Sequence, residues 1–229
     1  MSGLHVEYWG EGDRIAVLGH MQASSARAWW RLGPALADAG YRVIAPELPG
    51  HGRSPRMAEY SVEASTEALV EAIPSAPELV IAHSFSAILV ARALDRIRPS
   101  RVVYSDPAWL KVGSRERFAY YRNLKNWTLD DVRAEAPGWA PEGHRARFDS
   151  IADWDAEAIE QIDGYPGYEP ARPTVPSLIV TADPSVVIPA ERAERLRGIG
   201  FEVRPLPGTV HVLHEDDFAG FWKSLDGWV

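Results

Sequence analysis

The stretch Leu79-Val80-Ile81-Ala82-His83-Ser84-Phe85-Ser86-Ala87-Ile88-Leu89-Val90 decides the fold. Its first four residues form an apolar run typical of a buried strand, and residues 87–94 have the composition and spacing of a helix. A strand that turns into a helix within about two residues leaves no room for large flanking side chains. The residues two positions before and two positions after Ser84 are small, Ala82 and Ser86. The pattern predicts a strained turn that exposes the Ser84 hydroxyl at the carboxyl edge of a sheet, so Ser84 is the candidate nucleophile.

The composition of the chain limits its class. A length of 229 residues suits one α/β domain with an insertion. The chain has no cysteine, which excludes disulfides, a cysteine nucleophile and thiolate metal sites. Its net charge is −8 and it has no block of lysine and arginine, so we expect no nucleic-acid partner.

The N-terminal segment and the hydropathy pattern indicate where in the cell the protein is expected. Residues 1–5 have neither the basic nor the apolar region of a signal peptide. No apolar stretch approaches the roughly 20 residues that cross a bilayer. We therefore expect a soluble, cytoplasmic protein with a small-molecule substrate, no membrane partner and no cofactor, and a homodimer stays open.

Short apolar runs alternate with helical patterns along most of the chain. We expect an edge strand at residues 4–9 and further strands at residues 15–18, 41–45, 79–82, 101–104, 177–180 and 201–204. Helices are expected at residues 29–39, 61–73, 87–94, 189–197 and 215–225. This alternation predicts an α/β fold with a mainly parallel central sheet and helices on both faces. In such a sheet the functional site lies beyond the carboxyl ends of the strands.

The alternation breaks between residues 107 and 172. This segment lacks a clear apolar strand but holds ten of the 23 aromatic residues of the chain. Aromatic side chains supply large, rigid, mostly apolar contact area, so we expect a cap over a pocket for an apolar or aromatic substrate. Most of these aromatic residues should form the core of the cap. The candidates for the pocket lining are Trp109, Tyr120, Tyr121 and Trp127.

A serine hydroxyl needs a base within hydrogen-bond reach, and the base needs an acid that orients it. His211 is the candidate base because it follows the last predicted strand, in a loop that can reach the sheet edge. His214 is interpreted as a surface or capping residue, and His83 should point away from Ser84. Two aspartates terminate strands at the correct edge, Asp183 and Asp106.

An oxyanion hole needs two backbone N–H groups directed at the developing negative charge. Phe85 is the first candidate, because it lies at the N-terminus of the helix that follows Ser84, where the helix dipole also favours an anion. The second donor should come from the loop after residues 15–18. We expect it at Met21, with His20 as the alternative.

Together these features resemble the α/β-hydrolase fold over nearly the whole chain. Residues 82–86 (AHSFS) resemble the G-x-S-x-G elbow, and residues 45–54 (APELPGHGRS) are close to the D-x-P-G-x-G-x-S segment of the family. Residues 210–213 (VHVL) resemble the segment that carries the catalytic histidine. The resemblance implies a core of residues 1–106 and 173–229, with a helical cap of residues 107–172 inserted after the sixth strand.

The chain departs from the family pattern at four places. Small residues replace both elbow glycines, the usual His-Gly after the first core strand is reversed as Gly19-His20, and Glu47 stands where aspartate is usual. The segment around Asp183 lacks the glycine of the usual G-x-x-D, which strengthens Asp106 as an alternative. We nevertheless prefer Asp183 as the acid.

The resemblance implies a serine hydrolase that cleaves an ester, lactone, thioester or amide through an acyl-serine. The alternatives are a lyase, acyl-transfer or cyclisation reaction with the same triad, and a ligand-binding protein on the same scaffold. A metal site in residues 211–217 is not expected, because the run begins in a loop and has no partner cluster. Epoxide hydrolysis and dehalogenation are disfavoured because the family uses an acidic nucleophile for them.

Overall fold

A seven-stranded sheet forms the centre of the computed structural model, which describes residues 3–109, 115–162 and 165–229. The strands are β1 (Val6–Trp9), β2 (Arg14–Gly19), β3 (Tyr41–Pro46), β4 (Leu79–His83), β5 (Arg101–Ser105), β6 (Ser177–Asp183) and β7 (Glu202–Pro207). Their order in the sheet is β1-β3-β2-β4-β5-β6-β7. All neighbours pair in parallel except the edge strand β1, which runs antiparallel to β3. The predicted mainly parallel sheet is confirmed.

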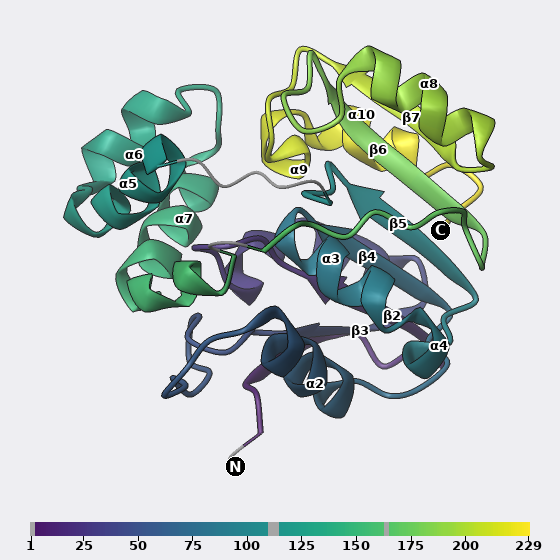
Figure 1. Ribbon diagram of the computed structural model, residues 1–229, viewed down its shortest axis with the longest axis horizontal. Coiled ribbons are helices and arrows are strands. Elements are labelled where there is room, and N and C mark those ends of the chain that lie inside the picture. Colours follow the sequence, from purple (N-terminus) through teal and green to yellow (C-terminus); the bar gives the residue numbers. More distant parts are fainter. Residues whose placement is uncertain (1–2, 110–114, 163–164) are drawn as a thin grey trace.

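Helices cover both faces of the sheet (Figure 1). One face carries α2 (Val62–Ala72), α3 (Phe85–Arg92), α4 (Leu94–Ile97) and α8 (Ala190–Gly198). The other carries η1 (Ala26–Trp29), α1 (Leu32–Asp38), α9 (Leu213–Asp216) and α10 (Phe218–Ser224). Strand β4 is buried throughout, and its side chains alternate between the two cores, with Val80 in one and Ile81 in the other. A continuous apolar run is what a central parallel strand requires.

Two predicted helices are divided in the structure. The segment predicted as one helix at residues 29–39 forms η1 and α1. The segment predicted at residues 215–225 forms α9 and α10, because the Asp217 side chain accepts a hydrogen bond from the Gly220 N–H at 3.0 Å and so starts a new helix. Ser61 caps α2 in the same way through the Ala64 N–H, as the sequence predicts.

The segment between β5 and β6 folds into short helices that we call the cap helices. They are α5 (Arg115–Asn123), η2 (Leu124–Asn126), α6 (Leu129–Glu135), α7 (Pro141–Asp153) and η3 (Ala156–Ile162). They have a small apolar core of their own, built around Leu124, Ile151 and Trp154, and Figure 1 shows α5, α6 and α7 grouped beside the sheet. The segment follows the fifth strand of the described chain, not the sixth as predicted, because only five strands precede it. Its status as a separate domain stays a prediction.

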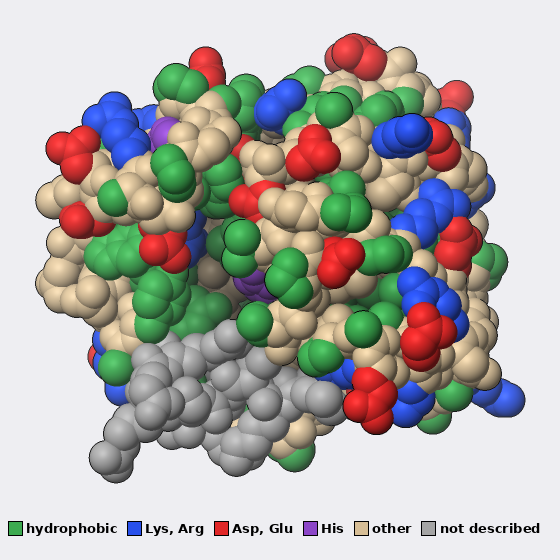
Figure 2. Space-filling view, turned by 90° about the horizontal axis from the view of Figure 1, so that it is seen from above, with side chains coloured by type: hydrophobic (Ala, Val, Ile, Leu, Met, Phe, Trp, Pro, Cys, Tyr) green, Lys and Arg blue, Asp and Glu red, His purple; other side chains and the backbone are tan. Residues whose placement is uncertain are grey.

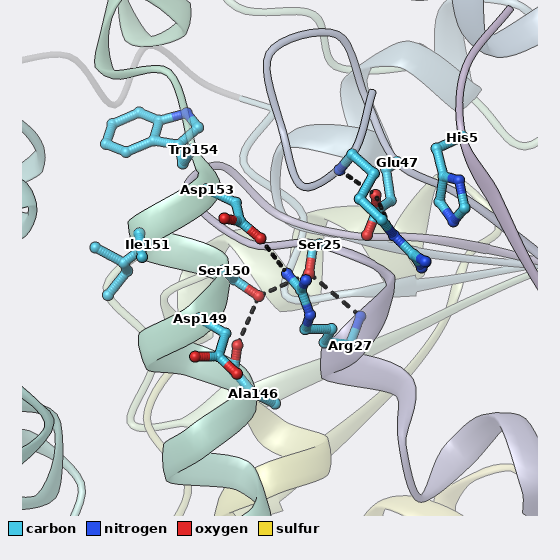
Figure 3. Close-up of polar contacts among 12 residues, drawn as sticks. His5, Ser25, Arg27, Glu47, Ala146, Asp149, Ser150, Ile151, Asp153 and Trp154 are labelled. Atoms are coloured by element: carbon cyan, nitrogen blue, oxygen red, sulfur yellow. Dashed lines mark hydrogen bonds and ion pairs between the residues drawn. The ribbon is translucent and has the colours of Figure 1, made fainter. Parts of the chain in front are cut away.

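Helix α7 is fixed to the loop that follows β2 and to the start of η1 (Figure 3). The Ser150 hydroxyl lies 2.7 Å from that of Ser25, and the Arg27 guanidinium donates to the Asp153 carboxylate at 2.8 Å. Because this loop also carries a candidate oxyanion donor, the position of α7 bears directly on the site. Among the described residues, every helix is too short or too polar to span a bilayer.

Candidate active site

Ser84 occupies the turn between β4 and α3. Its backbone has φ 53° and ψ −107°, a positive φ that side-chain-bearing residues rarely adopt. The turn is held by the hydrogen bond from the Ser84 N–H to the Ser105 carbonyl at 3.0 Å. Small neighbours allow this close strand-to-helix connection, and the result is the strained turn that the sequence predicts.

Ser84, His211 and Asp106 form a continuous chain of hydrogen bonds. The His211 Nε2 lies 2.9 Å from the Ser84 Oγ, and the His211 Nδ1 lies 2.6 Å from the Asp106 Oδ2. An ionised carboxylate only accepts hydrogen bonds, so the Nδ1 carries the proton and the Nε2 is free to accept from Ser84. The arrangement therefore provides a nucleophile, a base and an orienting acid.

The other oxygen of Asp106 is held by hydroxyl groups at the end of β6. Its Oδ1 accepts from Ser185 at 2.9 Å and from Thr181 at 3.1 Å. Asp106 is buried, with 1% of its surface exposed. These contacts satisfy the carboxylate and fix its second oxygen toward His211.

The preference for Asp183 as the acid is corrected by the structure. Asp183 is exposed at the end of β6, and its carboxylate forms no hydrogen bond or ion pair with a residue that the structure describes. The strand order explains the difference. Strand β5, which leads to Asp106, lies directly beside the strand that leads to Ser84, whereas β6 lies one strand further away.

Two backbone N–H groups near Ser84 are available to an oxyanion. Phe85 begins α3, and Met21 lies in the loop after β2; within the described residues, neither N–H forms a hydrogen bond. The His20 side chain instead shapes the loop, since its Nδ1 contacts the Met21 carbonyl at 2.8 Å and its Nε2 accepts from the Leu48 N–H at 2.9 Å. Burial lowers the pKa of His20 to about 4, so this ring is neutral.

A pocket of about 590 Å³ lies between the cap helices and the strand ends. It reaches His211 and Met21, and Figure 2 shows hydrophobic side chains gathered on the cap side beside a hollow. Its aromatic lining residues are Tyr120, Tyr121, Trp127 and Trp139. Three of these are predicted from the sequence, and Trp139 is an addition.

The prediction for Trp109 is wrong. Its side chain is fully buried, donates to the Ala87 carbonyl at 3.1 Å and packs against Tyr104 and Phe201. Trp109 follows β5 so closely that it packs into the core beside α3 instead of reaching the cap.

The alpha/beta hydrolase family model matches residues 16–222, which is most of the chain. The chain belongs to the alpha/beta hydrolase family. The match covers the elbow, the histidine and both candidate oxyanion loops.

Relatives of this alpha/beta hydrolase include the lipase LipV of Mycobacterium tuberculosis, 36% identical over 50% of this chain and 45% of the relative. The pimeloyl-[acyl-carrier protein] methyl ester esterase of Methylococcus capsulatus is 35% identical over 44% of this chain and 38% of the relative. These matches span less than half of each relative. The solved N-formylmaleamic acid deformylase of Pseudomonas putida has the same fold, with a TM-score of 0.82 and 20% identity over 96% of this chain and 95% of that one.

Ser86, the residue in the place of the second elbow glycine, explains why the first residue of the reversed Gly19-His20 is a glycine. A Cβ on Gly19 would lie 2.7 Å from the Ser86 Cβ, closer than real Cβ atoms approach. The Ser86 hydroxyl donates to the His20 carbonyl, so it also holds residues 20–25, the loop that we call the oxyanion loop because it carries the candidate donor Met21. The bulk that the elbow gains at position 86 is therefore accommodated by the glycine at position 19.

We expect Gly19→Ala to lower the free energy of unfolding by about 1–3 kcal/mol, because the added methyl group overpacks a closed contact. In a Ser86→Gly background, Gly19→Ala should lower the free energy of unfolding much less. Urea unfolding of the four proteins in this double-mutant cycle measures the coupling. Additive effects would show that the two positions do not compete for space.

His83 anchors the loop that carries His211, a role that the sequence did not reveal. Its side chain points away from Ser84, as predicted, and its Nε2 donates to the His211 carbonyl at 2.8 Å. Behind it His214 packs against Trp29 with 4.5 Å between ring centroids. His214 is 2% exposed, so its interpretation as a surface residue is wrong. Burial lowers the pKa of His214 to about 3.

Helix α9 connects the His211 loop to the cap. The Asp216 carboxylate accepts from the Trp139 Nε1 of the cap and from the Val210 N–H, both at 2.8 Å. The neighbouring Glu215 is buried and accepts from the Trp30 Nε1 at 2.8 Å. Burial raises the pKa of Glu215 to about 7.

The stability of the protein should depend on pH through Glu215. Its pKa rises from 4.5 to about 7 on folding, so between these values the folded state keeps a proton that the unfolded chain has lost. This contribution to stability is therefore complete below pH 4.5 and falls as the pH rises to about 7. Relative to wild type, the free energy of unfolding of Glu215→Gln should increase by up to about 3 kcal/mol between pH 4.5 and pH 8. Denaturant unfolding at both pH values measures the gain, and a difference that does not change with pH would contradict it.

Proposed function

We propose that the protein is a serine hydrolase that cleaves an ester, lactone, thioester or amide through an acyl-serine. The observation that carries the proposal is the chain of contacts from Ser84 through His211 to Asp106. A buried acid, a histidine with a defined tautomer and a serine on a strained turn are what an activated hydroxyl requires.

The reaction follows from the positions of these groups. The Ser84 Oγ attacks the carbonyl carbon while the His211 Nε2 takes its proton. The negative charge that develops on the carbonyl oxygen is stabilised by the N–H groups of Phe85 and Met21. His211 returns the proton to the leaving group, and a water molecule activated by the same nitrogen then releases the acyl group and regenerates Ser84.

Two relatives are named for reactions to which a serine nucleophile is not suited. They are a haloalkane dehalogenase of Psychrobacter cryohalolentis and an epoxide hydrolase of Mycobacterium tuberculosis. Attack of Ser84 on an alkyl halide or an epoxide gives an ether, which the base at His211 has no means to hydrolyse. An acyl-serine, in contrast, is an ester that water cleaves.

A lyase reaction is the second candidate. The chain is 36% identical over 92 residues to a protein named alpha-hydroxynitrile lyase of Arabidopsis thaliana. The same serine and histidine would then remove a proton from a substrate hydroxyl, with no acyl-serine formed. The two mechanisms differ in whether Ser84 becomes covalently modified during turnover.

A panel of esters, lactones and thioesters of increasing acyl size tests the proposal together with a fluorophosphonate probe. We expect hydrolysis of at least one class and a probe adduct on Ser84 that is lost in His211→Ala. Absence of labelling in a folded protein would refute the hydrolase mechanism. Labelling without hydrolysis of any compound would favour the lyase.

A further inference from the structure

One cationic side chain lines the pocket. Of the described residues around it, Arg147 of α7 is the one lysine or arginine. Its guanidinium donates to the Ala23 carbonyl of the oxyanion loop and interacts with the Tyr120 hydroxyl. A guanidinium has five N–H donors in a planar fork, so these two contacts leave donors for a further group.

Arg147 has no acidic partner at ion-pair distance among the residues that the structure describes. Other arginines in semi-enclosed positions do have one, since Arg192 pairs with Glu169 and Arg14 pairs with Glu78 at 2.7 Å. Burial of the guanidinium also lowers the pKa of Arg147, because the charged form is less well solvated there than in water. A cation in such a place is stabilised when an anion reaches it.

The acidic residues that line the same pocket do not fill this role. Both oxygens of Asp216 are occupied by Trp139 and Val210. Glu135 lies exposed at the end of α6, and it raises the pKa of Arg147 through its charge without forming an ion pair with the guanidinium. Among the described residues that line the pocket, no carboxylate therefore pairs with Arg147, and its guanidinium can bind an anion that enters the pocket.

A second lining residue is incompletely satisfied. The Gln22 side chain is 2% exposed, and its Nε2 donates to the Ala158 carbonyl at 2.9 Å. That contact fixes the orientation of the amide, because the oxygen cannot donate to a carbonyl. The Gln22 Oε1 is buried and has no hydrogen-bond partner in the described part of the chain. It is available to an O–H or N–H group of a ligand.

We propose that Arg147 binds a free carboxylate of the substrate, so that the enzyme acts on acyl compounds that are also carboxylic acids. The inference rests on the proposed hydrolase function and names the substrate class of the same site. A carboxylate matches the planar fork of the guanidinium with two parallel hydrogen bonds. The rest of the lining is mainly apolar, which suits a carbon chain between the acid and the scissile carbonyl.

Paired substrates separate recognition of the charge from a merely structural role of Arg147. We would measure kcat/KM for the monomethyl and dimethyl esters of glutaric acid in wild type, Arg147→Met and Arg147→Lys. Arg145→Met is the matched control, because Arg145 lies on the same helix but is exposed and paired with Asp149. Thermal melting checks that each variant is folded.

Wild type should have a higher kcat/KM for the monoester than for the diester. Arg147→Met should reduce this preference about 10- to 100-fold, because it lowers kcat/KM for the charged ester. Arg147→Lys should retain part of the preference, and Arg145→Met should retain all of it. An equal loss of activity on the monoester and on the diester in Arg147→Met would mean that Arg147 only holds the cap to Ala23, and would overturn the proposal. A wild type without preference for the charged ester would overturn it as well.

If neither ester is hydrolysed, calorimetric measurement of ligand binding tests the role of Arg147. Glutarate should bind wild type, and its neutral diamide should not; the binding should be lost in Arg147→Met. Inorganic phosphate that binds while glutarate does not would overturn the assignment to a carboxylate. Failure of the hydrolase function is seen separately, as absence of fluorophosphonate labelling at Ser84.

Discussion

Replacing Ser84 by alanine is expected to lower kcat/KM by at least about a thousandfold while leaving the fold intact. The change removes the atom that forms the covalent bond and lies 2.9 Å from the His211 Nε2. Any remaining rate would come from binding and from the oxyanion donors alone. The substitution removes a single oxygen, so the free energy of unfolding should change by less than about 1 kcal/mol. Hydrolysis of the best ester of the panel measures the effect.

Ser86→Ala is the matched control for this prediction. It removes a second hydroxyl from the same turn, two residues beyond Ser84. That hydroxyl donates to the His20 carbonyl and therefore supports the oxyanion loop without being placed to attack a substrate. We expect a loss of activity of less than about tenfold. Similar losses in the two variants would argue against a specific role for Ser84.

The second large effect is expected for Asp106→Asn, with a decrease in kcat of about 10³- to 10⁴-fold. An amide nitrogen in place of the Asp106 Oδ2 would donate to the His211 Nδ1, and the proton of the ring would then sit on the Nε2. In that tautomer the Nε2 cannot accept the proton of Ser84. The variant should still fold, because the amide oxygen keeps the place of the Asp106 Oδ1 and still accepts from the hydroxyl groups of Thr181 and Ser185.

Asp183→Asn should change kcat by less than about twofold, because the Asp183 carboxylate is exposed and does not contact His211. Steady-state kinetics of both variants over a range of pH separates the two aspartates. A larger loss in Asp183→Asn than in Asp106→Asn would mean that the acid lies at the end of β6 after all. Equal small losses would show that the histidine works without an orienting carboxylate.

The sequence predicts the parts of the site whose local pattern is distinctive. A buried strand that meets a helix around Ser84 leaves few other interpretations, and His211 follows the last strand, where a loop can reach the sheet edge. The parallel sheet follows from the same alternation of runs. These features depend on neighbours in the chain, which a sequence shows directly.

The sequence does not distinguish the acid or the pocket lining in the same way. Asp106 and Asp183 both terminate strands, and the difference between them lies in which strand borders β4. Trp109 and Tyr120 are both aromatic residues of the insertion, but one packs beside α3 and the other lines the pocket. Arg147 looks like any polar residue of an amphipathic helix until the pocket that it faces is known.

The central claim is that an acyl group passes through Ser84, and rapid quenching tests it most directly. The protein is mixed with an activated ester, quenched in acid within the first turnover and digested for peptide mass spectrometry. We predict the mass of the acyl group on the peptide that contains Ser84. Hydrolysis that continues with no acyl group on Ser84, or with the acyl group on another residue, would contradict the account.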